Sequence, residues 1–244
     1  MRILILTQYY PPEIGAPQAR LSELAAHFVN HGHSVSVLTA MPNYPLGKIY
    51  PGYGGLLRKE HQGRLEIFHT FIYPTQKTTF VARIANYLSF ACSSAVLGSF
   101  LLSRSDFLLV ESPPLFTGLS GTWLSKLKRA RLIFNVSDLW PESAVRLGIL
   151  RSESLTCRLS AWLERFCYRH AWLITGQSKS ILADIRERFP DRATFHLSNG
   201  VDTRRFHFER RTQKARECLN GNDKVVVLYA GLHGLAQGLD QVLE

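Results

Sequence analysis

From its first residues, the chain alternates short apolar runs with segments of helical periodicity. Residues 3–6 are a continuous apolar run, which is typical of a parallel strand covered on both faces. Apolar residues then recur at helical spacing along residues 21–29, Gly32 marks a helix end, and residues 35–38 form a second apolar run. This order predicts a β-α-β unit, which packs as part of a parallel sheet.

The same alternation continues through the next 160 residues or so, as in a domain of ordinary size. We expect further strands over residues 65–68, 107–110, 132–136, 172–175 and 194–197, and helices over 80–102, 117–128, 153–169 and 178–189. About seven strands alternating with helices predict an α/β fold with a doubly wound parallel sheet. Residues 41–62 are rich in Gly, Pro and Tyr, and they predict a long loop of the kind that often carries function.

The composition changes after residue 202. Residues 203–224 are rich in Arg and Lys and poor in apolar side chains, which predicts a linker with a short surface helix. Residues 225–230 then read as a new buried strand, and residues 239–243 read as the start of a helix. Because one strand and one helix start cannot bury a core, we expect residues 225–244 to be the truncated start of a second domain, after a first domain over residues 1–202.

Composition restricts the classes of protein and of partner. With 45% apolar and 20% charged residues, the chain is expected to fold, and its net charge of +10 favours anionic partners such as nucleotides, nucleic acid or an acidic membrane surface. Four cysteines in 244 residues are too few for a disulfide scaffold, and they form no C-x-x-C pair, which argues against a zinc ribbon. A reducing compartment fits this composition best. The apolar stretch at the N-terminus is too short for the core of a signal peptide.

The loop after the first strand is a usual ligand position in an open α/β sheet. It carries Gly15 before a helix start, but neither G-x-G-x-x-G nor a P-loop sequence, so a nicotinamide or flavin site is poorly supported. Gly15 would let a phosphate approach the free N–H groups of the helix start, or it simply forms a tight turn.

A polar cluster follows the strand expected over residues 132–136. Asp138, Trp140 and Glu142 lie on one loop at the carboxyl end of that strand, where such folds bind ligands. Two carboxylates and a Trp are suited to bind sugar hydroxyls and stack on a sugar ring. The alternative is that Asp138 caps a turn and Trp140 packs in the core.

No metal site is expected. His27 and His31 have i,i+4 spacing, but no carboxylate or Cys stands at ligand spacing beside them. We expect both on a solvated helix end, where a His is favoured by the helix dipole.

Two helices suggest contact with a membrane. Residues 84–102 carry no charge, but they contain several polar residues and lie between two strands of one sheet, so we favour a buried or membrane-docking helix over a span. In the helix over residues 153–169, one face holds apolar residues including Trp162, and Glu153 and Glu164 lie on the opposite face. A basic stripe runs along the edge of the apolar face and consists of Arg158, Arg165 and Arg169. Such a helix suits an anionic membrane interface, or it faces the core with Arg stems that reach solvent.

Three segments carry a resemblance to a known family. They are Asn199-Gly200-Val201-Asp202 with Phe206, Tyr229-Ala230-Gly231 with Gly234 and Gly238, and Tyr10-Pro11-Pro12-Glu13 with Gly15. Taken in their order along the chain, they resemble the corresponding segments of family 4 glycosyltransferases of the GT-B fold. Asp138-Leu139-Trp140-Pro141-Glu142 and the segment 234–238 resemble the branch that builds bacterial surface polysaccharides such as colanic acid and O-antigen, which includes L-fucosamine transferases.

The resemblance implies two Rossmann-like domains, with residues 225–244 opening the nucleotide-sugar-binding one. It implies transfer of a sugar from a nucleotide donor, usually a UDP-sugar, with retention and without a metal or other cofactor. The acceptor would be a lipid-linked saccharide at the cytoplasmic face of the inner membrane, with no nucleic acid as partner. Carried over by position, Gly15 and Gly234 would approach the donor phosphates, Asp138 would be catalytic, and Trp140 and Glu142 would bind sugar.

Two departures from the family pattern bear on activity. The E-x7-E pair that grips the donor belongs deep in the second domain, and Glu209 and Glu217 have this spacing only by coincidence in the linker. Gln237 stands where many members have a basic residue. We therefore expect the chain to be inactive alone. A nucleotide-sugar epimerase of similar architecture and a non-catalytic membrane-binding domain are the alternative functions.

Overall fold

An eight-stranded sheet organises the first part of the chain. The structure is a computed structural model that describes residues 1–77, 79–204, 206–207, 209, 212–218, 225–231 and 238–243. It divides into two units, Met1–Ser198 and Asn199–Glu244. The sheet belongs to the first unit, and its strands are β1 (Arg2–Leu6), β2 (Ser34–Ala40), β3 (Leu57–Gln62), β4 (Leu65–Thr70), β5 (Phe107–Ser112), β6 (Arg131–Val136), β7 (Leu173–Gly176) and β8 (Thr194–His196).

The strand order is β3-β4-β2-β1-β5-β6-β7-β8, and every neighbouring pair except β3 and β4 is parallel. From β1 the chain builds the sheet outward through β2 and β4, and then returns to the other side of β1 with β5. The strand order therefore reverses between β1 and β5. This is the topological switch point, beside which open α/β sheets bind their ligands.

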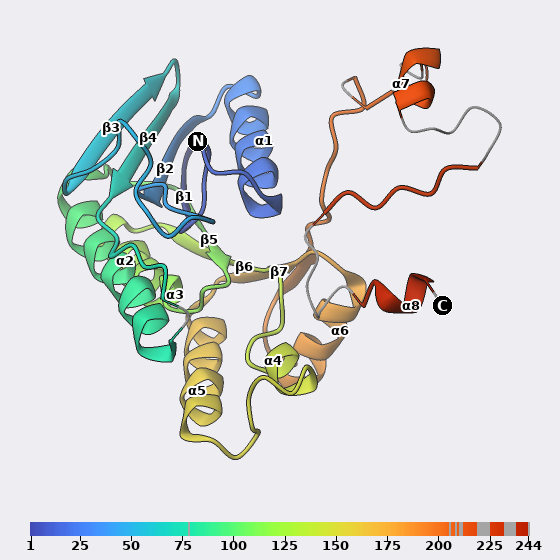
Figure 1. Ribbon diagram of the computed structural model, residues 1–244. Coiled ribbons are helices and arrows are strands. Elements are labelled where there is room, and N and C mark those ends of the chain that lie inside the picture. Colours follow the sequence, from blue (N-terminus) through green and yellow to red (C-terminus); the bar gives the residue numbers. More distant parts are fainter. Residues whose placement is uncertain are drawn as a thin grey trace. The chain divides into compact units, whose positions relative to one another are not determined.

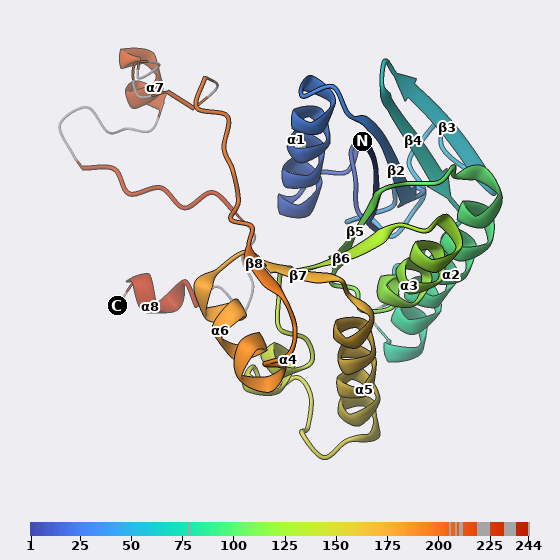
Figure 2. The same ribbon diagram turned by 180° about the vertical axis from the view of Figure 1, so that it is seen from behind.

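Helices cover both faces of this sheet (Figures 1 and 2). The helices of the first unit are α1 (Ala16–Asn30), α2 (Phe80–Leu101), α3 (Thr117–Lys128), α4 (Glu142–Arg146), α5 (Leu155–His170) and α6 (Lys179–Arg188). Figure 1 shows α1 on one face and α2, α3 and α5 on the other. The expected α/β fold with a doubly wound sheet is thus confirmed.

Alternation of side chains along the strands creates two cores. In β1, Ile3 and Ile5 pack with Leu21 of α1 in one core, whereas Leu4 and Leu6 pack in the core on the other face. That second core is the larger one and includes side chains of α2, α3 and α5. Since both faces of β1 are buried, its sequence is continuously apolar.

The structure corrects the sequence prediction for residues 41–62. The last six of these residues form β3, which pairs antiparallel with β4 at the sheet edge, instead of belonging to a long loop. Its side chains are mostly exposed on both faces. An edge strand of this kind has no apolar alternation, so periodicity could not reveal it. The short helix α4 was not predicted either.

The second unit contains two short helices, α7 (Gln213–Cys218) and α8 (Asp240–Leu243). Both agree with the expected surface helix and helix start. The buried strand expected over residues 225–230 is wrong, because these residues have no regular structure and are exposed. No strand among the described residues of this unit pairs with them, and a strand needs a partner for its backbone hydrogen bonds.

Candidate functional site

The candidate site lies at the carboxyl edge of the parallel strands, beside the switch point. Here α1 follows β1, and the chain leaves β5, β6 and β7 at the same edge. Parallel strands bring these exits together although they are far apart in sequence. Each exit carries polar side chains, and the structure joins several of them.

A buried ion pair bridges the switch point. Arg20 of α1 contacts Glu111 at the end of β5, with its Nη2 atom 2.5 Å from Oε1 of the carboxylate. The Glu111 side chain is 2% exposed, and that of Arg20 is 14% exposed. The same Nη2 atom donates a hydrogen bond to the hydroxyl of Ser137 at 3.0 Å. Ser137, which directly follows β6, donates its own hydroxyl proton to Glu111.

Amide side chains extend this network across β6 and β7. Asn135 donates to Oε2 of Glu111 at 2.7 Å and accepts a hydrogen bond from the hydroxyl of Thr175 at 2.7 Å. Gln177, after β7, donates to the Ser137 hydroxyl at 2.6 Å. Through these bonds, three neighbouring strand ends and α1 are held in one fixed arrangement, which we call the edge network: Arg20, Glu111, Asn135, Ser137, Thr175 and Gln177.

Burial has the largest effect on the pKa of Glu111. It raises the pKa of the Glu111 carboxyl above its ordinary value, while the charge of Arg20 and the hydrogen bonds from Ser137 and Asn135 oppose this shift. Burial therefore disfavours the charged carboxylate, and its partners favour it.

The loop between β1 and α1 is held by a second buried carboxylate. Glu13 accepts hydrogen bonds from the backbone N–H groups of Asn43 at 2.7 Å and of Tyr44 at 2.8 Å, so it ties this loop to the one after β2. Gly15 is the N-cap of α1 and receives no side-chain cap. A Cβ atom at Gly15 would lie 2.5 Å from the side-chain oxygen of buried Gln18. The helix start expected to face a phosphate is therefore built around a residue without a side chain.

Asp138, Trp140 and Glu142 lie in the segment of the chain that directly follows Ser137 of the edge network. Asp138 follows Ser137, is exposed, and accepts a hydrogen bond from the hydroxyl of Ser143 at 3.0 Å. Trp140 packs against the larger core and is partly buried. Glu142 begins α4 and forms an ion pair with Arg146 at 2.5 Å. Of the three, Asp138 is the side chain that the fold leaves most open to a ligand.

The remaining predicted site residues lie elsewhere. Gly234 is outside the described residues. Trp162, Arg158, Arg165 and Arg169 are all exposed on α5. Among the residues that the structure describes, no group of three or more His, Cys, Asp or Glu side chains is arranged to hold a metal ion.

The outer side of α5 is apolar and exposed. Leu155 is 74% exposed and Trp162 is 57% exposed, whereas Leu163 is buried. Glu164, which lies opposite the apolar face, is turned toward the protein and is only 3% exposed. Its carboxylate can be buried because it forms an ion pair with Arg188. The apolar stripe of exposed Leu155, Leu159 and Trp162 together with Phe166, which is partly buried against the larger core, is called the α5 stripe below.

A similar surface lies on α2. By length and composition this helix could cross a membrane, and 28% of its most apolar 18-residue window is buried in the structure. One side of α2 packs on the sheet through residues such as Phe90, while Val81, Val96 and Phe100 are exposed. The helix is thus an integral part of the first unit with an apolar outer side.

Sequence reasoning missed most of the edge network. Glu111 carries a detectable signal, because a carboxylate directly follows the apolar run 107–110, as Asp138 follows the run 132–136. Arg20 carries no such signal. It lies within a helix, 91 residues from Glu111 in sequence, and only the sheet topology brings the two together.

Comparisons with known proteins give a family from the sequence and a fold from solved structures. The sequence pattern of the Glycosyl transferase 4-like domain matches residues 15–200. Over its whole length the chain is 24% identical to WcaI of Escherichia coli strain K12, which is named as a colanic acid biosynthesis glycosyl transferase. The chain covers 62% of that protein.

Two solved structures illustrate the likeness in fold. Sucrose-phosphate synthase from Thermosynechococcus elongatus superimposes with a TM-score of 0.58 at 14% identity, over 90% of this chain and 52% of that one. Anabaena Alr3699/HepE in complex with UDP-glucose gives a TM-score of 0.53 at 15% identity, over 91% of this chain and 50% of that one. The chain therefore spans about half the length of these structures, in agreement with the expected Rossmann-like domain.

Proposed function

The chain belongs to the family of glycosyl transferase 4-like domains, and from this membership we propose that it is the acceptor-side domain of a retaining glycosyltransferase. It works together with a second, nucleotide-binding domain of the same protein. The observation that carries this proposal is the edge network beside the switch point, which holds the exposed Asp138 at the carboxyl edge of the sheet.

The donor is a nucleotide-sugar, most simply a UDP-sugar. This part of the proposal is supported by the solved structure of Alr3699/HepE, which holds UDP-glucose and shares this fold. The start of α1 at Gly15 offers free backbone N–H groups and the positive end of a helix dipole, both of which favour a phosphate. No metal is required in this proposal.

Asp138 is the proposed catalytic carboxylate. In the transfer, the oxygen of the acceptor hydroxyl bonds to the anomeric carbon, the bond from that carbon to the diphosphate breaks, and the proton of the hydroxyl passes to the leaving diphosphate. Positive charge develops on the donor sugar as the diphosphate leaves. A carboxylate fixed nearby stabilises this charge or orients the acceptor, and Trp140 and Glu142 contribute to the binding of sugar.

The acceptor is a lipid-linked saccharide at the cytoplasmic face of the inner membrane, in the biosynthesis of a bacterial surface polysaccharide. The name of WcaI supports the pathway. The α5 stripe, the apolar outer side of α2 and the net charge of +10 support peripheral contact with an anionic membrane.

The test is transfer of labelled sugar from a set of UDP-sugars to lipid-linked saccharides extracted from bacterial membranes. It uses the protein that carries this chain together with its second domain, with and without a chelator. We expect transfer with one donor, retention at the anomeric carbon, and no effect of the chelator. Epimerisation of the donor without transfer would favour the epimerase alternative instead.

A variant separates a catalytic Asp138 from a structural one. Asp138→Asn should keep the melting temperature and lose at least about 100-fold in turnover, as is usual when a charge-stabilising group is removed. Glu23→Gln, which changes an exposed carboxylate of α1, is the matched control and should change neither quantity. If turnover of the Asp138 variant falls only in step with its folded fraction, Asp138 merely caps a turn.

A further inference from the structure

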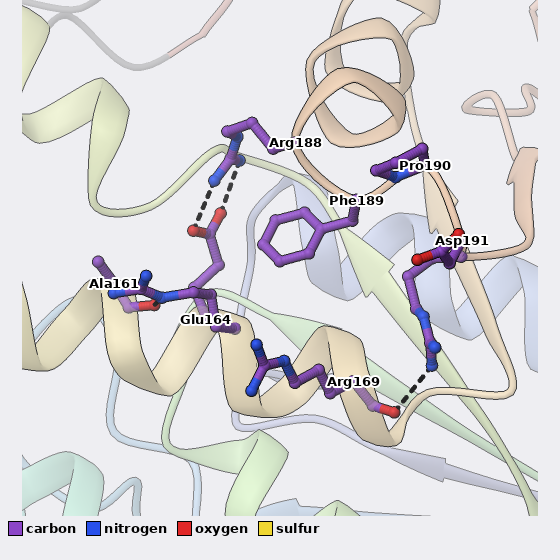
Figure 3. A pocket seen from close by; sticks show the side chains of 9 residues that line it. Ala161, Glu164, Arg169, Arg188, Phe189, Pro190 and Asp191 are labelled. Carbon is purple, nitrogen blue, oxygen red and sulfur yellow. Dashed lines mark hydrogen bonds and ion pairs between the residues drawn. The ribbon is translucent and has the colours of Figure 1, made fainter.

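A pocket of about 590 Å³ lies between α5 and the segment that follows α6 (Figure 3). Because α5 leads into β7 and residues 189–192 lead into β8, the pocket lies at the amino end of these strands. It is therefore separate from the edge network, which lies at their carboxyl end. The charged residues of its lining are four arginines and two carboxylates: Arg165, Arg169, Arg188, Arg192, Glu164 and Asp191.

One arginine of the pocket is already neutralised. Arg188 donates two hydrogen bonds to the two carboxylate oxygens of Glu164, both at 2.8 Å, as the dashed lines in Figure 3 show. Arg188 also contacts Asp184 at 2.7 Å. These bonds hold Arg188 in place in the wall of the pocket. Because the charge of Glu164 is neutralised by Arg188, Glu164 does not attract a further cation.

The other three arginines have no carboxylate partner within the described part of the chain. Arg165 donates from Nε to the backbone oxygen of Ala161 at 3.2 Å, and Arg192 donates from Nη1 to the backbone oxygen of Arg169 at 3.0 Å. The guanidinium group of Arg169 makes no hydrogen bond or ion pair with any described residue. The lining therefore holds three guanidinium groups that have no described carboxylate partner and one further carboxylate, that of Asp191. Such a group favours an anion with several oxygens, since guanidinium N–H groups match the geometry of phosphate.

Two arginines of the pocket lie next to the α5 stripe on the helix, because Arg165 and Arg169 follow Trp162 and Phe166 by three residues each. Arg165 and Arg169 project from the same helix as Leu159, Trp162 and Phe166, and Leu159 and Trp162 are exposed. The rings of Trp162 and Phe166 stack with their centres 5.8 Å apart. A ligand of this surface would therefore meet an anion-binding pocket and an apolar surface side by side.

We propose that the pocket binds the phosphate of an anionic phospholipid head group while the α5 stripe lies in the apolar part of the membrane interface. The inference rests on the proposed membrane association and adds a discrete head-group site to it. A free phosphate would use the pocket but not the stripe, whereas a phospholipid uses both. For this reason the structure favours the lipid as the source of the phosphate.

The experiment compares two arginines of the same basic stripe. Binding of the chain to vesicles of phosphatidylcholine with phosphatidylglycerol is measured by sedimentation, with phosphatidylcholine vesicles alone as reference. Arg158→Gln removes a charge outside the pocket and should weaken binding about fivefold, the ordinary effect of one charge near an anionic surface. Arg169→Gln removes a pocket arginine and should weaken it at least about tenfold more, because charge-assisted hydrogen bonds are lost as well. Asp191→Asn should strengthen binding.

Three outcomes would overturn this proposal. Equal losses for Arg158→Gln and Arg169→Gln would mean that attraction to the membrane is diffuse. Binding of inorganic phosphate that Arg169→Gln abolishes, without a matching loss of vesicle binding, would make the pocket a site for a soluble anion. Absence of binding to any vesicle would refute the membrane association too. A failure of sugar transfer is distinguishable from all three, because sedimentation requires neither donor nor acceptor.

Discussion

Two buried carboxylates hold the loops of the candidate site by different means. Glu13 accepts hydrogen bonds from backbone N–H groups of the loop after β2 and forms no ion pair with a described residue. Glu111 instead depends on Arg20, with help from Ser137 and Asn135. Burial raises the pKa of both carboxyl groups. Consequently, the loop after β1 is held by uncharged hydrogen-bond donors, whereas the strand ends beyond the switch point depend on one ion pair.

Replacing Arg20 should therefore destabilise the fold in a pH-dependent way. A carboxyl group whose pKa is higher in the folded state contributes stability below its unfolded pKa and loses it as the pH rises through its folded pKa. Arg20→Met removes an interaction that lowers the pKa of Glu111, so the pKa of this carboxyl in the folded state rises further. The loss of folding stability at high pH therefore becomes larger. We expect a loss of about 3–5 kcal/mol in the free energy of unfolding near pH 8, as for a buried charge left unpaired. Near pH 4, close to the ordinary pKa of a glutamate, less of the Glu111 charge has to be buried on folding, so the loss should be smaller.

Urea unfolding at the two pH values measures this difference. The double variant Arg20→Met with Glu111→Gln is the control, since it removes the buried charge and should recover part of the stability near pH 8. An equal loss at both pH values would show that Arg20 acts by packing and not by its charge.

Helix α5 has the reverse of the usual arrangement of a surface helix. Its inner side carries Glu164 and Tyr168 next to Leu163 and Cys167, and its outer side carries the α5 stripe. The ion pair of Glu164 with Arg188 makes the polar inner side tolerable. The apolar outer side is then free to serve an external partner, which is the physical basis of the proposed membrane contact.

Two leucines of this helix, four residues apart, test its orientation. Leu159 is 66% exposed and Leu163 is 6% exposed. Leu163→Ala should lower the free energy of unfolding by about 2–5 kcal/mol because it leaves a cavity in the core. Leu159→Ala should change it by about 0.5 kcal/mol or less, as for an ordinary exposed position. Denaturant unfolding of the two variants is sufficient, and a large loss for Leu159→Ala would contradict the exposed α5 stripe.

The two units differ in their buried apolar cores. Met1–Ser198 contains the sheet and both cores. The described residues of the second unit include α7, α8 and the exposed segment 225–230. A segment with few buried contacts opens easily to proteases.

Limited trypsin digestion followed by mass spectrometry should therefore cut first after residue 198. The expected product is a resistant fragment close to Met1–Ser198, because the described residues Arg204, Lys214 and Arg216 that follow it lie outside the two cores. Early cleavage within the first unit, or protection of residues 225–243 equal to that of the sheet, would refute this division of stability.

The order of elements could be predicted from the sequence because it depends on local periodicity. Continuous apolar runs such as residues 3–6 require cover on both faces, and helical spacing in residues 117–128 predicted α3 with the bounds that the structure has. Strand β3 was missed because its pairing with β4 is made by the backbone and leaves no apolar pattern in its side chains. Residues 225–230 were misinterpreted because an apolar run favours a strand only where a partner strand is present.

For the candidate site, the sequence by itself determined which polar groups follow which strands, and so it located Asp138, Trp140 and Glu142 at the carboxyl edge. Only the tertiary structure decided which of these groups meet. Ser137 and Arg20 are 117 residues apart in sequence, yet they are hydrogen-bonded at 3.0 Å because the strand order reverses between β1 and β5. The outward orientation of the α5 stripe was decided in the same way, since burial of Glu164 depends on Arg188, which is 24 residues further along the chain. Periodicity identifies the two sides of a helix, but the partners supplied by distant segments determine which side is buried.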